Sequence, residues 1–128
     1  MERYKMDKVL ITTLQKEFNQ LSNTLEDSSV EYWFARDLQK ILGYERWENF
    51  VNVIQKAKIA CENSGIEVSD HFRDVTKMVS IGSNTQRPIE DMMLTRYACY
   101  LIAQNGDSKK EQIAFAQTYF AIQTRKQE

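Results

Sequence analysis

The sequence lacks a long apolar run, a secretory signal and any pairing of cysteines. No apolar stretch approaches the roughly 20 residues that a helix needs to cross a bilayer. The amino terminus runs into an amphipathic pattern without an apolar block or a small-residue cleavage site, so we expect a cytoplasmic protein with no membrane partner. Cys61 and Cys99 form neither a CxxC motif nor a metal spacing, which favours two buried thiols over a disulfide.

The sequence also lacks an excess of positive charge. Its 17 lysines and arginines are balanced by 18 acids, giving a formal net charge of −1. A small DNA-binding domain commonly carries strong positive excess, so any nucleic-acid surface here must be local. One acid-free stretch stands out, because between Val75 and Ile89 the only charged residues are Lys77 and Arg87.

Catalytic motifs are absent. His71 is the only histidine and has no serine or cysteine motif to pair with, so we expect a capping or packing role. The metal site of a nuclease would require several carboxylates to lie close together, and the spacing of the candidates in the sequence does not require this. The candidates are Asp70, Asp74, Glu90 and Asp91. We assign no catalytic residue, no metal and no cofactor.

The chain is long enough for one globular domain. Its 128 residues are 42% hydrophobic, which argues against disorder and allows burial of about two thirds of the unfolded surface. The patterns predict an α+β fold that is mainly α. It would contain a helix-turn-helix-like pair and a small antiparallel β-hairpin or sheet. We divide the domain into an amino-terminal amphipathic helix, residues 1–27, and the remainder, residues 28–128.

The first helix is predicted by an apolar stripe at spacings of four, four, three and four. The stripe consists of Leu10, Leu14, Phe18, Leu21 and Leu25, which predicts a helix over residues 6–25. This helix either caps the domain or pairs with a copy of itself to form a homodimer.

A helix-turn-helix pattern follows a short strand. Residues 30–34 are rich in strand formers, and a brief helix over residues 36–42 is stopped by Gly43. A second helix begins at about Trp47 and ends at residues 63–65. This is the order in which helix-turn-helix proteins present their second helix to the major groove of DNA.

The second helix separates an apolar face from a polar one. Its inward face would comprise Trp47, Phe50, Ile54, Ala57 and Cys61. A period of 3.6 then places Asn49, Asn52 and Lys56 on one outward stripe, flanked by Arg46 and Lys58. Asparagine can bond an adenine edge and lysine a phosphate or guanine. The alternative is an ordinary solvated helix surface.

The segment from residues 78 to 94 changes to a strand-like pattern. Residues 78–81 and 89–92 flank a predicted loop over residues 82–88, which is rich in turn formers. The loop's Asn84, Gln86 and Arg87 are phosphate donors, so it would act like the wing of a winged helix. The alternative is a solvated hairpin. We expect loop and outward stripe to form one continuous surface free of nearby carboxylates.

Two packed helices with a shared polar network are predicted at the carboxyl end. Thr95 would cap a helix over residues 96–104, and Ser108 with Glu111 reads as a capping box for the last helix. The last helix would bury Ile113, Ala116 and Phe120, with Phe115, Tyr119 and Ile122 on an adjoining stripe. Aromatic residues of both helices, Tyr97, Tyr100, Tyr119 and Phe120, are expected in the core rather than stacked on bases.

Three segments resemble a known family. The stretches Ile81–Asn84, Arg96–Asp107 and Gln117–Arg125 are similar to the DNA-damage-inducible protein D family, whose amino-terminal half is similar to the Bro-N domain of viral and phage regulatory proteins. The resemblance runs from about Trp33 to Glu128 and leaves out the first helix. It implies a non-enzymatic DNA-binding module of the DNA-damage (SOS) response, and a chain that continues beyond this sequence.

The expected function is therefore DNA binding, to duplex or single strands. The contacts would come from Arg46, Asn49, Asn52, Lys56, Lys58, Asn84, Gln86 and Arg87. A protein-interaction module that acts on recombination or repair proteins is the first alternative, and a metal-dependent nuclease is the weaker one. Salt distinguishes the first two, because phosphate contacts weaken steeply as salt is added.

Overall fold

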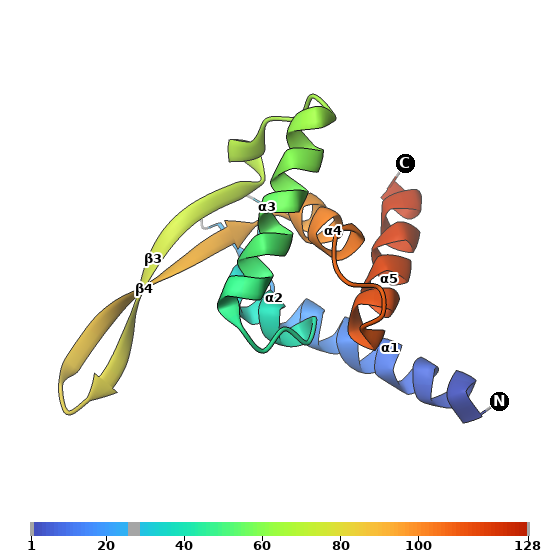
Figure 1. The fold of residues 1–128 in the computed structure, drawn as a ribbon, viewed down its shortest axis with the longest axis horizontal. Coiled ribbons are helices and arrows are strands. Elements are labelled where there is room, and N and C mark those ends of the chain that lie inside the picture. Colours follow the sequence, from blue (N-terminus) through green and yellow to red (C-terminus); the bar gives the residue numbers. More distant parts are fainter. Residues whose placement is uncertain (1, 26–28, 128) are drawn as a thin grey trace.

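The computed structural model describes residues 2–25 and 29–127, with side chains described at Val9 and over residues 12–25 and 29–122. Within these residues the chain forms five α-helices, a short 3-10 turn and a four-stranded antiparallel sheet (Figure 1). The elements follow the order α1 (Glu2–Gln20), β1 (Asn23–Thr24), β2 (Glu31–Phe34), α2 (Ala35–Ile41), α3 (Trp47–Asn63), η1 (Val68–Asp70), β3 (Phe72–Gly82), β4 (Thr85–Leu94), α4 (Arg96–Gln104) and α5 (Glu111–Gln127). The predicted fold class, mainly α within α+β, is confirmed.

The sheet has the strand order β1-β2-β4-β3, and its strands differ greatly in length. β2 pairs with β4 only at its base, through Trp33↔Leu94 and Phe34↔Met93. β3 and β4 pair along their whole length, from Phe72↔Leu94 to Gly82↔Thr85. The hairpin therefore continues past the rest of the sheet and projects from the helical body (Figure 1).

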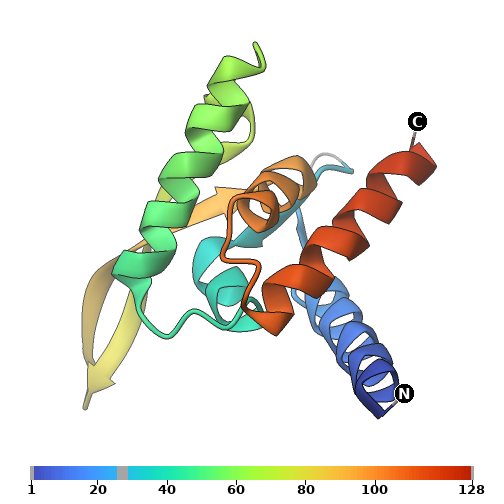
Figure 2. The same cartoon turned by 45° about the vertical axis from the view of Figure 1, so that its right-hand side comes forward.

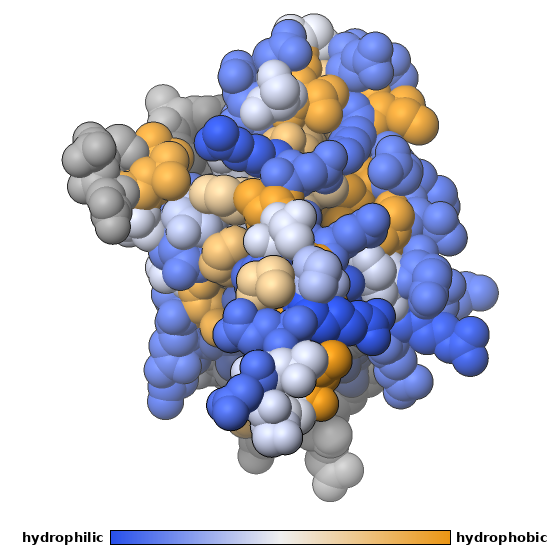
Figure 3. All heavy atoms as spheres, turned by 90° about the vertical axis from the view of Figure 1, so that its left-hand side faces the viewer, coloured by the Kyte–Doolittle hydropathy of each residue, from blue (hydrophilic) through white to orange (hydrophobic). Residues whose placement is uncertain are grey.

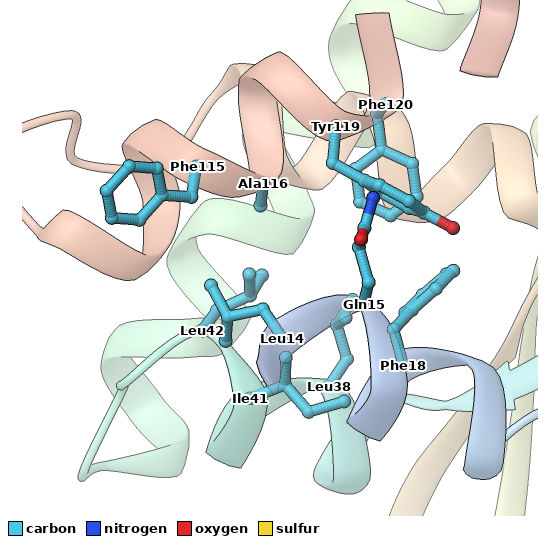
Figure 4. Close-up of a pocket in the computed structure, with 10 residues that line it drawn as sticks. All are labelled: Leu14, Gln15, Phe18, Leu38, Ile41, Leu42, Phe115, Ala116, Tyr119 and Phe120. Atoms are coloured by element: carbon cyan, nitrogen blue, oxygen red, sulfur yellow. The ribbon is translucent and has the colours of Figure 1, made fainter. Parts of the chain in front are cut away.

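The core is centred on Trp33 and on the inner faces of the helices. The Trp33 side chain is fully buried, stacks on the Phe18 ring at 4.2 Å and donates from Nε1 to the Phe18 carbonyl oxygen at 2.7 Å. This contact fastens α1 to the sheet, and α1 also packs against α2 and α5 (Figures 1 and 2). An apolar cavity of about 20 Å³ remains between these three helices (Figure 4), which is room for about one water molecule.

The first predicted helix is correct in its centre and wrong at its end. Leu14 and Phe18 are buried, whereas the side chain of Leu10 lies outside the described residues. The helix ends at Gln20, because the chain then forms β1 and pairs with β2 instead of continuing the apolar spacing. Leu25 is consequently 40% exposed. Residues 26–28, where the predicted boundary between 1–27 and 28–128 falls, lie outside the described residues.

The helix pair α2 and α3 follows the prediction closely. Gly43 and Gly65 have φ values of +79° and +76°, the left-handed conformation that ends a helix and that glycine adopts without strain. On α3 the predicted inner face is confirmed, because four of its five residues are buried and Trp47 is half-buried. The buried residues are Phe50, Ile54, Ala57 and Cys61.

The cap of α4 is confirmed, and the cap predicted for α5 is wrong. Thr95 Oγ1 accepts from the Ala98 backbone N–H at 3.2 Å, as predicted. α5 begins only at Glu111, and the Asp107 carboxylate instead accepts from the Lys109 N–H at 3.0 Å in the preceding turn.

The predicted buried face of α5 is confirmed except at its end. Ile113, Ala116 and Phe120 are buried, whereas Ile122 is 49% exposed. Helices α4 and α5 pack together, and the Gln117 side-chain amide on α5 donates to the Ala103 carbonyl on α4 at 2.9 Å. The remaining aromatic side chains, Tyr97, Tyr100, Phe115 and Tyr119, are partly buried and pack against the core.

Both thiols and the histidine have structural environments. Cys61 and Cys99 are free and fully buried, and desolvation raises the pKa of each thiol. His71 Nδ1 lies 2.6 Å from Thr95 Oγ1, and its ring packs on Tyr97 at 4.9 Å, which confirms a packing role. None of the helices in the described part of the chain combines the length and the apolar character that crossing a bilayer requires.

Candidate nucleic-acid interface

The turn between α2 and α3 is held by hydrogen bonds on both sides. The Tyr44 backbone N–H donates to the Gln39 carbonyl, and the Gln39 side-chain amide donates back to the Tyr44 carbonyl, each at 3.0 Å. Tyr44 itself is buried, and its hydroxyl accepts from the Asp107 N–H at 3.1 Å. The orientation of α3 relative to α2 is therefore fixed by the fold.

The outward face of α3 carries the predicted contact residues on open surface. Asn49, Asn52 and Lys56 are exposed along the helix, and Arg46 is exposed at its amino-terminal cap. Lys58 is half-buried. Among the contacts between described residues, no hydrogen bond or ion pair engages the side chain of any of these five.

The hairpin tip is tighter than the sequence predicted. The predicted loop over residues 82–88 is wrong, because only Ser83 and Asn84 connect the paired strands, with Asn84 at φ +63°. Gln86 pairs with Ser80 across the strands, and Arg87 and Pro88 also belong to β4. Proline is tolerated because β2 does not reach this part of β4, which leaves one edge of the strand unpaired.

Residues 78–88, here called the arm, extend beyond the body. All residues from Ser80 to Pro88 are exposed, so Asn84, Gln86 and Arg87 face solvent. Arg87 is the only charged residue of the arm. Seen from the side to which the arm points, the surface is largely hydrophilic with scattered apolar side chains (Figure 3). The arm therefore presents a cation and hydrogen-bonding groups without a carboxylate.

A buried charge cluster joins the base of the hairpin to the body. Asp91 is 3% exposed, and its Oδ1 accepts from the backbone N–H groups of Arg36 at 3.0 Å and Met92 at 2.8 Å. Lys77 Nζ lies 2.9 Å from Asp91 Oδ2 and 3.5 Å from the centre of the Phe34 ring. The sequence did not reveal this cluster, because Lys77 and Asp91 are 14 positions apart with nothing in the pattern to pair them.

Arg36 links the hairpin to α3. Its Nε donates to the Glu90 carbonyl at 2.7 Å, and its guanidinium lies 4.2 Å from the centre of the Trp47 ring. One side chain from α2 thus contacts both β4 and the first turn of α3. These contacts of Arg36 therefore set the position of the hairpin base relative to α3.

A polar cleft of about 520 Å³ separates α3 from the base of the hairpin. Its α3 wall includes Gln55 and Lys58, and its hairpin wall includes the exposed acids Asp74 and Glu90. None of the outward stripe of Asn49, Asn52 and Lys56 lines this cleft. The stripe therefore lies outside this cleft, and the acids Asp74 and Glu90 lie between α3 and the base of the hairpin. That the stripe and the arm form one continuous surface stays a prediction.

The sequence comparisons identify the family. Residues 22–121 match the model of the BRO family, N-terminal domain. The chain belongs to the BRO family. All eight predicted contact residues lie within this BRO N-terminal domain, whereas α1 precedes it.

One curated relative supports the resemblance drawn from the motifs. The DNA damage-inducible protein D of Escherichia coli (strain K12) is 54% identical to the chain over 101 residues, which is 79% of this chain and 37% of the relative. The chain thus spans little more than a third of that relative's length. No solved structure matches the chain.

The carboxylates considered as metal ligands lie in different environments. Asp91 is engaged by Lys77 and two backbone donors, while Asp74 and Glu90 are exposed on the cleft. Within the part of the chain that the structure describes, no group of three or more histidine, cysteine, aspartate or glutamate side chains is arranged to hold a metal ion.

Proposed function

We propose that this BRO family domain is a non-enzymatic regulatory module that binds DNA through α3 and the arm. The observation that carries the proposal is the position of the candidate residues. Seven of the eight are exposed and the eighth, Lys58, is half-buried, and their side chains have no partner among the described residues. Unengaged amides and cations on a helix that follows a fixed turn are available for a ligand.

The two surfaces would make different contacts. On α3, Asn49 and Asn52 are suited to base edges, because the asparagine side chain can donate to and accept from adenine at once. Arg46 and Lys56 would neutralise phosphates on either side of the groove. On the arm, Arg87 would bind a phosphate, with Asn84 and Gln86 adding oriented hydrogen bonds.

The acidic cleft limits how DNA can approach. Asp74 and Glu90 would repel phosphates that enter the space between α3 and the hairpin base. DNA would therefore touch the outward side of α3 and the arm at two separate places. This arrangement also agrees with a net charge near zero, because the positive charge is needed only at those places.

We further propose that the domain acts in the cellular response to DNA damage, in the cytoplasm. The support is the 54% identity to a relative whose name states that it is DNA damage-inducible. The chain covers 37% of that relative's length, and we propose that the domain contributes DNA contacts to this response.

The test is retention of labelled DNA by the chain in a gel across a salt series. We expect binding to duplex or single-stranded DNA that weakens steeply with salt. The double charge reversal K56E/R87E should abolish retention, while K16E, which reverses an exposed lysine on α1, should leave it unchanged. Circular dichroism would confirm that both variants fold. Equal retention by all three proteins would remove α3 and the arm as the binding surface.

The second candidate function is a module that binds recombination or repair proteins. The cleft favours it, because Trp47 and Val51 lie beside polar and acidic groups, a mixture typical of protein interfaces. Absence of DNA retention at low salt, together with capture of a purified recombination protein, would support this function instead. Strand cleavage on addition of a divalent metal would indicate the nuclease.

A further inference from the structure

The arm carries a bulge next to its tip. Ser80 pairs with Gln86 and Gly82 pairs with Thr85, which leaves Ile81 as an extra residue without a partner across the strands. A bulge of this kind redirects the side chain that it contains. The Ile81 side chain is 57% exposed, although the body of the protein has a well-formed apolar core.

The surroundings of Ile81 leave it free to contact a ligand. Gly82 follows it at φ +144° with open space around the position where a side chain would begin. Ser83 and Asn84 then close the turn, so the residues after Ile81 are small and polar. Ile81 is thus the large apolar side chain nearest the tip of a projecting arm.

Contacts at the base of the hairpin hold the arm to the body. The buried Asp91 carboxylate binds Lys77 on β3 and the Arg36 backbone N–H on α2, and the Arg36 side chain joins β4 to α3. A wedge needs such support, because force applied at the tip would otherwise bend the arm instead of the ligand. The ion pair between Lys77 and Asp91 provides part of this support at the root of the arm.

We propose that the arm enters the minor groove of duplex DNA and that Ile81 inserts between neighbouring base pairs, kinking the duplex. This inference rests on the proposed DNA-binding function and specifies how the arm acts. Isoleucine is among the apolar side chains that architectural proteins use as wedges, and a two-stranded ribbon is one of the elements that such proteins place in the minor groove. Arg87 would contact the negative potential of that groove.

The charge of the arm favours DNA over a second copy of the chain as the binding partner of the arm. Arg87 is the only charged residue of the arm, and Lys77 at its root is already paired with Asp91. Two arms packed against each other would bring two Arg87 guanidinium groups together without a carboxylate, whereas a phosphate backbone complements them. The donors Ser80, Asn84 and Gln86 on the same arm fit a groove lined by acceptors better than an apolar interface.

The experiment measures DNA bending independently of sequence preference. A duplex of about 100 bp is shorter than the persistence length of about 150 bp, so ligase closes it into circles only when a protein bends it. We expect the full chain to promote circle formation. The variant I81S should still retain DNA in a gel but form about tenfold fewer circles, because the wedge is lost.

Met78 provides a matched control on the same arm. Its side chain is 55% exposed, close to that of Ile81, but it pairs regularly with Pro88 and lies farther from the tip. M78S should bend DNA as the wild type does. Equal loss in both variants, or undiminished circle formation by I81S, would overturn the wedge while leaving DNA binding intact.

Two further results would also decide against the proposal. Wild-type protein that retains DNA but forms no circles would show binding without bending. Wild-type protein that fails to retain DNA at low salt would remove the proposed function, and the wedge with it. Sedimentation of wild type and I81S should give the same mass, because a change from dimer to monomer in I81S would assign the arm to a second copy.

Discussion

Lys77 Nζ lies 2.9 Å from the buried Asp91 carboxylate, and this pair joins the two strands of the hairpin at the root of the arm. The side chain of Asp91 is fully covered, whereas that of Lys77 keeps 32% of its surface exposed. The carboxylate also accepts from two backbone N–H groups, one of them in the first turn of α2. A single residue thus joins both strands of the hairpin to α2.

Replacing Asp91 with alanine should destabilise the protein by about 3 to 5 kcal/mol, because it leaves the Lys77 ammonium and two backbone donors without their partner. Urea unfolding followed by circular dichroism measures the change. D74A is the control, since Asp74 is an exposed acid on the same hairpin, and should shift stability by no more than about 0.5 kcal/mol. Similar losses in the two variants would contradict the structural role of Asp91.

Replacing Phe18 with alanine should cost about 3 to 5 kcal/mol, because Phe18 stacks on Trp33 and fastens α1 to the core. V9A should change stability by no more than about 0.5 kcal/mol, since Val9 is 68% exposed on the same helix.

If α1 caps its own domain, the unfolding midpoint of the wild-type protein should not depend on protein concentration. A concentration-dependent midpoint would instead indicate the homodimer through α1.

Replacing Arg87 with alanine should weaken DNA binding and reduce the steepness of its salt dependence by about one unit of slope in log K against log salt. The reason is the loss of one phosphate contact. K16A, which removes an exposed lysine from α1, should keep the wild-type slope. Fluorescence anisotropy titrations at several salt concentrations would measure both slopes, and an unchanged slope in R87A would remove the arm from the phosphate contacts.

The two cysteines should react slowly with a thiol reagent in the folded protein. Burial raises the pKa of both the Cys61 and Cys99 thiols, so at mildly alkaline pH less of the reactive thiolate is present than in an exposed cysteine. Both side chains are also fully covered. Labelling followed by absorbance should accelerate sharply in denaturant, and rapid labelling of either thiol in buffer alone would contradict their burial.

Replacing Gly106 with alanine should destabilise the fold by about 1 to 3 kcal/mol through overpacking. The added methyl carbon would lie 2.6 Å from Ile113 Cδ1, and the Ile113 side chain is fully buried and has little room to move. G65A is the comparison, because nothing lies within 4 Å there and only the φ of +76° opposes the change, at a cost of about 1 kcal/mol. Thermal unfolding would rank the two variants, and a smaller effect in G106A would contradict the packing.

Local signals were sufficient to predict α3 and its neighbours. The apolar spacing from Phe50 to Cys61 and the glycine at position 65 locate the helix, because helical period and left-handed glycine act over a few residues. The exposure of Asn49, Asn52 and Lys56 follows from the same period. Whether those side chains contact DNA stays a prediction.

The predictions from the sequence are wrong where strand pairing between distant residues decides the structure. Leu21 and Leu25 continue the spacing of α1, but the chain leaves the helix because Asn23 and Thr24 pair with β2. The sequence predicts that Pro88 lies in a loop, because residues 82–88 are rich in turn formers. Proline has no backbone N–H, but the structure accommodates Pro88 in β4, where one edge of the strand is unpaired.

The sequence by itself determined the helices apart from their ends, the hairpin apart from its tip, the buried thiols and the exposed stripe of α3. Each of these depends on a repeat or a turn within a few positions. The tertiary structure alone decided that Asp91 anchors Lys77, that Ile81 forms a bulge and that Asp74 and Glu90 line the cleft between α3 and the base of the hairpin. These relationships join residues far apart in the chain or depend on the pairing of two strands. Their energies come from contacts that exist only once the chain has folded.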